Sequence, residues 1–173
     1  MLRLMLLRHA KSSWVDASLT DRERPLAGRG RKAAAAMGLF MASKGYAPRL
    51  ILCSPARRAR QTLELVAPAF KRDIDTRIEQ ELYDFGDGSA IIEVVRSLAY
   101  KGSPVAIIAH NPAMEGAALC LCAPGLDEIH ERMADKYPTA ALAVIDFDID
   151  HWRDLKVGTG QLKSFTTPRD IGT

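Results

Sequence analysis

The chain has 173 residues, of which 47% are hydrophobic and 26% charged, and its formal net charge is +3. A chain of this length supplies one buried core but hardly two, so we predict a single domain over residues 1–173. The composition excludes a disordered or fibrous protein. The net charge is too small to indicate a nucleic-acid-binding protein.

The first half of the chain predicts strands and helices in alternation. A short apolar run at 3–7 is typical of a strand that is buried on both faces. The Ala-rich stretch 25–45 predicts a helix that stops at Gly45. The apolar patterns of the following segments predict a strand at 49–53 and a helix at 59–70.

The second half continues this alternation. We predict a helix at 89–100 and a strand at 104–109. A further helix is expected after this strand, because Asn111 can cap its N-terminus and Pro112 suits its first turn.

Two late segments, 139–148 and 161–167, predict strands that pair antiparallel, and the glycine-containing stretch 157–160 would permit a hairpin. The alternation of strands and helices along the chain indicates the α/β class. We therefore expect a three-layer sandwich in which a mostly parallel central sheet carries helices on both faces.

Polar side chains follow directly after three of the predicted strands. Arg8 and His9 follow the first, the stretch 54–58 follows the second, and His110 and Asn111 follow a later one. Open α/β sheets bind ligands beyond the carboxyl ends of their strands. If these strands are neighbours, two imidazoles and at least two guanidinium groups converge on one site beside a helix N-terminus.

These residue types are suited to a phosphoryl group. Guanidinium groups bind phosphate oxygens bidentately, and a helix N-terminus adds aligned amides. A neutral imidazole can attack phosphorus in line and form a phosphohistidine, which water then hydrolyses. Taken singly, each histidine or arginine is better explained by an unrelated contact, so the interpretation depends on their matching positions after three strands.

Three motifs in the chain resemble those of the histidine phosphatase (phosphoglycerate mutase-like) superfamily. LLRHA at 6–10 is similar to its Arg-His-Gly signature, with alanine in place of the glycine. SPARRARQT at 54–62 resembles its Ser-Pro-Leu-x-Arg-Ala-x-Gln-Thr motif, and HNP at 110–112 resembles its second-histidine motif. LRHAKSSW at 7–14, followed by RPL at 24–26, is most similar to the SixA-type phosphohistidine phosphatase branch.

The resemblance implies a phosphoglycerate mutase-like fold and a phosphatase that needs neither metal nor cofactor. It implies His9 as the nucleophile that carries the phosphoryl group in a covalent intermediate. The residues expected to bind the phosphoryl group are Arg8, Arg58, His110 and Asn111.

Members of the family usually have an acidic residue that protonates the leaving group. Glu81, in the segment QELYDFGD, is the best match in this chain, and Asp84 is the alternative. An acid at this point would assist departure of the leaving group as the bond to phosphorus breaks.

The predicted substrate is phosphohistidine in a protein, and a small phosphorylated metabolite is the alternative for the same site. A third hypothesis is a module that binds phosphorylated partners without turnover, with the basic stretch 22–32 recruiting an acidic partner. The presence of both His9 and His110 argues against this hypothesis, since arginines alone would suffice for binding. The favoured interpretation of the basic stretch 22–32 is a solvent-exposed face.

The cysteines and the N-terminal stretch bear on the cellular compartment of the protein. Cys53, Cys120 and Cys122 cannot all pair, and their spacing is not that of a zinc site, so we expect small core residues in a reducing compartment. The N-terminal apolar run is short and lacks a cleavage-like site, and no stretch reaches membrane-spanning length. We predict a cytoplasmic protein with no nucleic-acid or membrane partner.

Overall fold

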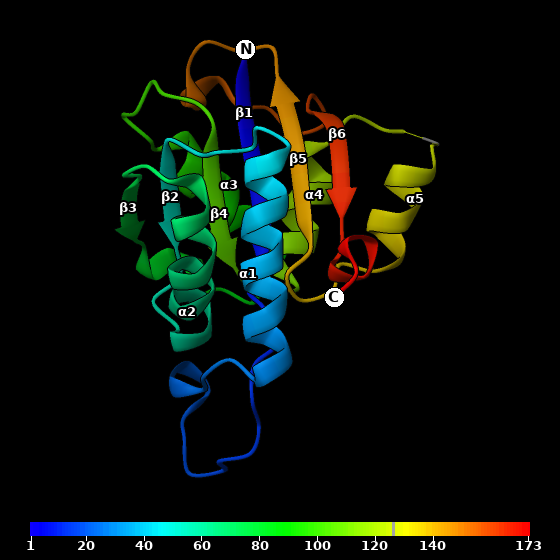
Figure 1. Ribbon diagram of the computed structural model, residues 1–173. Coiled ribbons are helices and arrows are strands. Elements are labelled where there is room, and N and C mark those ends of the chain that lie inside the picture. The colour runs from blue at the N-terminus through cyan, green and yellow to red at the C-terminus, as the bar shows by residue number, and fades with distance from the viewer. Residues whose placement is uncertain (126) are drawn as a thin grey trace.

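The computed structural model describes residues 1–125 and 127–173 and contains one six-stranded sheet with helices on both faces (Figure 1). The strands, in chain order, are β1 (Leu2–Arg8), β2 (Leu50–Cys53), β3 (Asp75–Ile78), β4 (Val105–Ala109), β5 (Leu142–Phe147) and β6 (Gln161–Thr166). The helices are α1 (Gly28–Ser43), α2 (Arg57–Val66), α3 (Ser89–Arg96), α4 (Ala113–Leu121) and α5 (Glu128–Asp135).

The sheet is mostly parallel, in the order β3-β2-β4-β1-β5-β6. The first four strands of this order run parallel to one another, whereas β5 is antiparallel to both β1 and β6. Helices α1 and α2 lie in front of the sheet in Figure 1, and α3 and α4 lie behind it. The predicted α/β sandwich with a largely parallel sheet is therefore confirmed.

The central strand β1 is apolar from Leu4 to Leu7 because both of its faces are covered there. Leu4 and Leu6 belong to the core cluster that contains the buried residues of α3 and α4. Met5 and Leu7 belong to the cluster on the other face, with α1 and α2. Successive side chains of a strand point to opposite faces, so a strand between two helical layers loses the polar alternation of a surface strand. This burial holds the end of β1 firmly in place.

Two elements that the sequence analysis did not predict, β3 and α5, are mostly exposed. All four residues of the edge strand β3 are exposed, so it carries no apolar pattern. Helix α5 has one buried residue, Met133. It begins after Asp127, whose carboxylate accepts a hydrogen bond from the backbone N–H of His130 at 3.0 Å.

Several helix boundaries differ from the prediction. The helix predicted at 59–70 begins earlier, at Arg57, and its α-helical part ends at Val66. A short 3-10 turn follows and contains Pro68, which lacks the backbone N–H needed to continue the α-helical pattern. The helix predicted at 89–100 ends at Arg96. Gly45 follows α1 with a φ of +71°, as a stop at this position requires.

Asn111 does not cap α4, contrary to the prediction. Pro112 occupies the N-cap position, and no side-chain capping bond is present there. The amide nitrogen of Asn111 instead donates to the carboxylate of Glu115 at 2.8 Å and to the carbonyl of Tyr137 at 3.2 Å. The side chain is therefore used to tie α4 to the segment before β5.

Strands β5 and β6 pair antiparallel as predicted, but no tight hairpin joins them. Their connection includes a 3-10 turn at Trp152–Asp154. The glycines expected in the turn bind the end of α4 instead, because Gly158 N–H donates to Cys120 O and Gly160 N–H donates to Leu121 O, each at 2.9 Å. The connection thus crosses to a neighbouring helix before the chain returns to the sheet.

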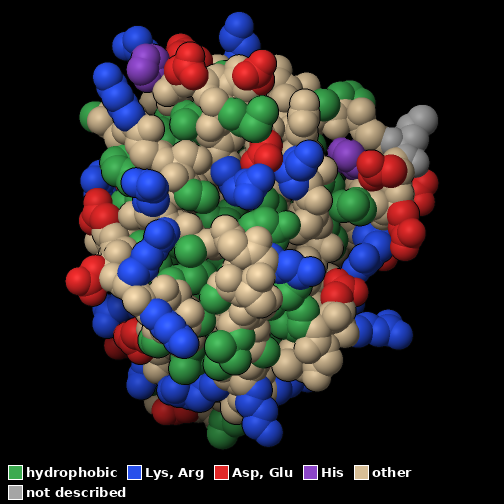
Figure 2. Space-filling view, turned by 45° about the horizontal axis from the view of Figure 1, so that its top comes forward, with side chains coloured by type: hydrophobic (Ala, Val, Ile, Leu, Met, Phe, Trp, Pro, Cys, Tyr) green, Lys and Arg blue, Asp and Glu red, His purple; other side chains and the backbone are tan. Residues whose placement is uncertain are grey.

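Charged side chains of both signs are scattered over the face that Figure 2 shows, with hydrophobic side chains between them. Such mixing is ordinary for the surface of a globular protein. None of the helices in the described part of the chain combines the length and hydropathy needed to cross a membrane.

Candidate functional site

The three polar strand ends meet at one edge of the sheet. Strand β4 lies between β1 and β2 and is parallel to both, so the residues that follow these strands are neighbours. The rings of His9, after β1, and His110, after β4, have their centroids 4.9 Å apart. Both side chains are buried, with 7% of His9 and 0% of His110 exposed.

Two neighbours hold His9 in one tautomer. Its Nδ1 lies 2.8 Å from the carbonyl oxygen of Ala10, which can only accept, so Nδ1 carries the proton. Its Nε2 lies 3.3 Å from the Nε–H of Arg58, which can only donate, so Nε2 keeps its lone pair. Burial lowers the pKa of His9 to about 3; the Ala10 carbonyl opposes this effect, and Arg58 and Arg8 add to it. At neutral pH His9 therefore has the form that can attack phosphorus.

Arg58 is the buried guanidinium group at the centre of the site. It lies in the first turn of α2 and is 1% exposed. Its Nη2 lies 3.2 Å from Nδ1 of His110 and donates to Oδ2 of Asp21 at 2.9 Å, while its Nη1 donates to the backbone carbonyl of Asp21 at 2.5 Å. With its bond to His9, this one side chain joins four groups of the site.

Ser54, at the end of β2, orients the second histidine. Because Arg58 can only donate, Nδ1 of His110 accepts, and its Nε2–H donates to the hydroxyl oxygen of Ser54 at 2.7 Å. Burial, followed by the charges of His9 and Arg58, lowers the pKa of His110 to about 2. Both imidazoles of the site are thus neutral at physiological pH.

The end of the motif at 54–62 holds the backbone around His9. The hydroxyl of Thr62 accepts from the backbone N–H of Ala10 at 3.0 Å and donates to the carbonyl of Arg58 at 2.7 Å. The side-chain oxygen of Gln61 accepts from the backbone N–H of Leu26 at 2.8 Å. Helix α2 therefore positions Arg58 and, at the same time, the chain that carries the nucleophile.

Asp21 is a site residue that sequence reasoning missed. Its carboxylate accepts from Arg58, from the Tyr83 hydroxyl at 2.8 Å and from Arg24 at 2.8 Å. Partial burial raises the pKa of this carboxyl, but the hydrogen bonds from Tyr83, Arg58 and Arg24 outweigh it and lower the pKa to about 2. Asp21 is therefore ionised at neutral pH.

A local signal for this turn is present in the sequence. In TDRE, the carboxylate of Glu23 binds the hydroxyl of Thr20 at 2.7 Å and its backbone N–H at 3.4 Å, as in a capping box. The basic stretch 22–32 that follows is not a uniformly solvated face, contrary to its interpretation from sequence. Arg24 is 7% exposed, and its guanidinium lies 3.4 Å from the centre of the Trp14 ring.

Arg8 and Asn111 lie at the side of the site toward the segment before β5. Arg8 donates from Nη1 to the carbonyl of Tyr137 at 2.7 Å, and its buried Nε has no hydrogen-bond partner among the described residues. Burial lowers the pKa of Arg8, with the charge of Glu115 opposing it. The Oδ1 atom of Asn111 is likewise buried without a partner in the described part of the chain.

The segment QELYDFGD brings aromatic rings, rather than Glu81, to the site. Tyr83 and Phe85 lie with their ring centroids 5.5 Å and 5.1 Å from that of His110. Glu81 is exposed and lines a separate surface hollow, and within the described residues neither Glu81 nor Asp84 makes a hydrogen bond to the cluster. Among the residues that the structure describes, Asp21 is the one whose carboxylate pairs with Arg58.

Cys53 does not contribute a thiolate to this edge of the sheet. It is 0% exposed, and burial raises the pKa of its thiol to about 12. The two cysteines near α4 differ, because Cys122 is buried whereas Cys120 is exposed. Within the described residues, no three His, Cys, Asp or Glu side chains are grouped so that they could hold a metal ion.

The neutral state of the two histidines predicts a pH-dependent stability. Above pH 7 the folded and unfolded chains both hold them neutral, but as the pH falls below about 6.5 only the unfolded chain binds the protons. The free energy of unfolding should therefore fall with decreasing pH, by about 1.4 kcal/mol per pH unit for each histidine well below pH 6.5. Denaturant unfolding at pH 7.5 and 5.5 measures this slope. It should be shallower in His110→Gln, and equal slopes would contradict the assignment.

Comparisons with known proteins show the family of the chain. The model of the histidine phosphatase superfamily (branch 1) matches residues 4–90. An uncharacterized protein of Mycobacterium tuberculosis (strain H37Rv) is 33% identical over 165 residues, which cover 94% of this chain and 100% of the relative.

Solved structures share the fold over nearly the whole chain. The structure of a candidate phosphohistidine phosphatase SixA from Agrobacterium tumefaciens is 29% identical, with a TM-score of 0.79 over 96% of this chain and 98% of the other. Its counterpart from Nakamurella multipartitia is 26% identical, with a TM-score of 0.79 over 96% of each chain. The chain belongs to the histidine phosphatase superfamily, and its fold is the phosphoglycerate mutase-like fold of the SixA-type branch.

Proposed function

We propose that this protein is a cofactor-independent phosphatase that hydrolyses phosphohistidine in a protein through a covalent intermediate on His9. The neutral, oriented imidazole of His9 beside the guanidinium of Arg58 supports the reaction class. The names of the similar SixA structures support the choice of substrate.

The first step transfers the phosphoryl group to the enzyme. The lone pair on His9 Nε2 forms a bond to phosphorus as the bond from phosphorus to the substrate imidazole breaks and its electron pair stays on that imidazole. Arg58 and Arg8 bind the phosphoryl oxygens and stabilise the charge that develops on them. Arg58 already lies within hydrogen-bond distance of Nε2, so attacking atom and charge-stabilising group are positioned together.

The second step restores the enzyme. A water molecule attacks the phosphorus of phospho-His9, the bond from phosphorus to Nε2 breaks, and inorganic phosphate leaves with the water oxygen. The electron pair returns to Nε2 while the Ala10 carbonyl keeps the proton on Nδ1. His110, fixed by Ser54, lies beside this reacting centre.

The state of Asp21 is the observation that carries the choice of phosphohistidine. An alkoxide leaving group needs a proton as its bond to phosphorus breaks. The carboxyl that contacts Arg58, that of Asp21, is ionised, with a pKa of about 2, and so it is a poor proton donor at neutral pH. An imidazole, with an ordinary pKa of about 6.5, can leave already protonated. A site in which the carboxyl bound to Arg58 is already ionised therefore suits an imidazole leaving group.

The aromatic residues near His110 also suit a flat leaving group. Phe85 is 47% exposed and stands beside Tyr83, with ring centroids 5.2 Å apart. An imidazole ring could pack against such a surface, since aromatic rings pair favourably at centroid distances of about 4.5–7 Å. A small phosphorylated metabolite is the second candidate substrate, because a cavity of about 450 Å³ opens beside Arg8.

Two carboxylate variants test the leaving-group assignment. Wild-type enzyme should show kcat/KM for a phosphohistidine protein at least about 100-fold above that for an alkyl phosphate, the usual contribution of a general acid. Asp21→Asn should change kcat/KM for phosphohistidine by less than about fivefold, because asparagine retains a hydrogen-bond acceptor for Arg58. It should bind vanadate more tightly, since a negative charge beside the anion is lost.

Glu81→Gln is the matched carboxylate variant and should leave both substrates unaffected, because Glu81 is exposed and lines a different hollow. Single-turnover rates of phosphoenzyme formation provide the measurement, so that hydrolysis of the intermediate does not mask the first step. A selective loss on the alkyl phosphate in Glu81→Gln would instead establish Glu81 as the acid. The same selective loss in Asp21→Asn would assign that role to Asp21.

A further inference from the structure

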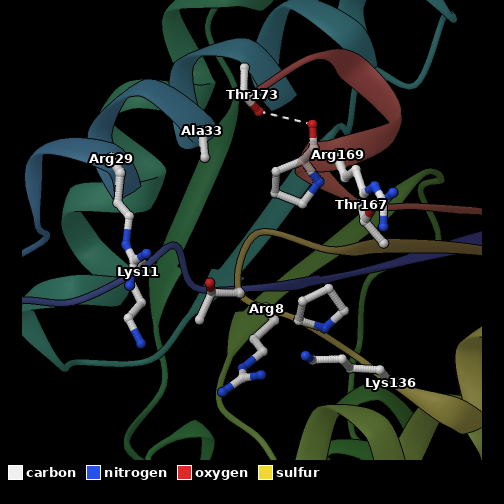
Figure 3. A pocket seen from close by; sticks show the side chains of 11 residues that line it. Arg8, Lys11, Arg29, Ala33, Lys136, Thr167, Arg169 and Thr173 are labelled. Atoms are coloured by element: carbon white, nitrogen blue, oxygen red, sulfur yellow. Dashed lines mark hydrogen bonds between the residues drawn. The ribbon is translucent and has the colours of Figure 1, made fainter.

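A cavity of about 450 Å³ lies beside the phosphoryl site and shares Arg8 with it (Figure 3). The cations that line it are Arg8, Lys11, Arg29, Lys136 and Arg169. The remaining lining consists of proline, alanine and threonine side chains, and the lining residues that the structure describes include no aspartate or glutamate. The side chains that line the cavity therefore carry a net positive charge.

All of these cations except Arg8 lack acidic partners among the residues that the structure describes. In the described part of the chain, no ion pair involves Lys11, Arg29, Lys136 or Arg169. The acid next in sequence to Arg169 is Asp170, whose carboxylate is taken by Arg132 and Thr167. Buried nitrogen atoms rarely remain without a partner, yet the Nε of Arg8 does. Both observations indicate that an anion completes this region.

The fold fixes the cavity relative to the catalytic histidine. Helix α1 approaches the chain after His9 so closely that a Cβ at Gly30 would lie 2.1 Å from the carbonyl oxygen of Lys11. This contact places Arg29 beside Lys11 on one side of Arg8 in Figure 3. On the other side, the bond from Arg8 to the Tyr137 carbonyl holds the segment that carries Lys136, whose amino group points toward Arg8.

We propose that the cavity binds a second anionic group of the substrate, a carboxylate or a phosphate carried by the leaving group. This inference rests on the proposed function, in which the transferred phosphoryl group occupies the cluster around Arg58 and His9. Lysine and arginine side chains are the usual partners of carboxylates and phosphates. The volume lies within the range of about 300–1,000 Å³ that is typical of small-molecule sites, so it accommodates more than a single ion.

The anionic group has two chemical sources, which the experiment separates. The first is an acid group within a phosphorylated metabolite, and the second is an acidic side chain beside phosphohistidine in a protein. Phenyl phosphate and 4-carboxyphenyl phosphate differ only in a carboxylate and represent the first source. Two phosphohistidine peptides, with flanking glutamates or flanking glutamines, represent the second.

We expect wild-type kcat/KM to be about tenfold higher for the anionic member of at least one pair, the effect of roughly two favourable charge contacts. Arg29→Ala combined with Lys136→Ala should abolish this preference by raising KM for the anionic member. Both side chains are exposed, so their truncation should leave folding intact. Lys32→Ala is the matched control, since Lys32 is an exposed cation of α1 that does not line the cavity. It should retain the preference.

Each outcome decides between the hypotheses. A preference confined to the phenyl phosphates identifies a metabolite as the source, and one confined to the peptides identifies a protein. Equal kcat/KM within both pairs, or a preference that the double variant retains, would overturn the cavity assignment while the phosphatase function stands. Failure of the wild-type enzyme to hydrolyse any of the four compounds would instead refute the proposed function.

Discussion

His9→Ala should lower phosphatase kcat by roughly 10⁴-fold or more, the scale seen when an enzyme loses its nucleophile. The reason is chemical, since the substitution removes the imidazole whose Nε2 lone pair attacks phosphorus in the proposed mechanism. His9 lies at a strand end rather than within the main core clusters, so we expect the folded state to persist. Steady-state kinetics and thermal unfolding of the same preparations test both statements.

The covalent intermediate gives this prediction a sharper test. Enzyme quenched in acid-free denaturant during turnover should carry an acid-labile phosphoryl group on His9. His151→Ala is the control, because His151 lines a different surface cavity, and it should be labelled like the wild type. Label on a serine or on Cys53, or no label at any time during turnover, would contradict the proposed mechanism.

Much of the fold could be predicted from the sequence because the pattern of apolar residues indicates which segments are buried. Strands β1 and β4 are nearly continuous apolar runs, and both are covered on two faces. The edge strand β3 and the helix α5 escaped prediction for the opposite reason, since most of their side chains remain exposed. The apolar pattern of a segment indicates how much of that segment is buried. Elements at the rim of the structure are mostly exposed, so they lack such a pattern.

The part of the site that lies directly after the strands could be predicted from the sequence. His9, Arg58 and His110 meet because β1, β4 and β2 are neighbours, which the matching polar ends suggested. The position of Asp21 could not be deduced in the same way, because the chain between β1 and α1 must first fold back over α2. Its capping box predicts a local turn but not the partner of that turn.

The segment around Glu81 shows a related limit. Sequence reasoning selected it for a carboxylate, whereas the contacts of this segment with His110 come from Tyr83 and Phe85. Side-chain direction within a short irregular segment depends on its exact backbone path, which neither composition nor spacing specifies. The role of Glu81 therefore stays a prediction, while the rings of Tyr83 and Phe85 are the side chains of this segment that the structure places beside His110.

Substitution of Arg58 has the second large expected effect, because its guanidinium group contacts several groups of the site at the same time. Its three nitrogens contact His9, His110, and both the carboxylate and the backbone carbonyl of Asp21. A lysine at this position keeps the positive charge but has a single terminal nitrogen, so it cannot reproduce the planar fork. The change thus separates the role of geometry from that of charge.

Arg58→Lys should lower kcat/KM by about 10³-fold, the scale of losing a preorganised donor to the transition state. Arg57→Lys is the matched control, since Arg57 is the preceding residue, is exposed and lines a separate hollow, and it should remain within about twofold of wild type. Because Arg58 is buried, unfolding curves must accompany the kinetics, and single-turnover phosphoenzyme formation should show the same loss in the folded fraction. Near-normal rates in folded Arg58→Lys would mean that positive charge alone suffices, and the role assigned to the planar fork of Arg58 would then be wrong.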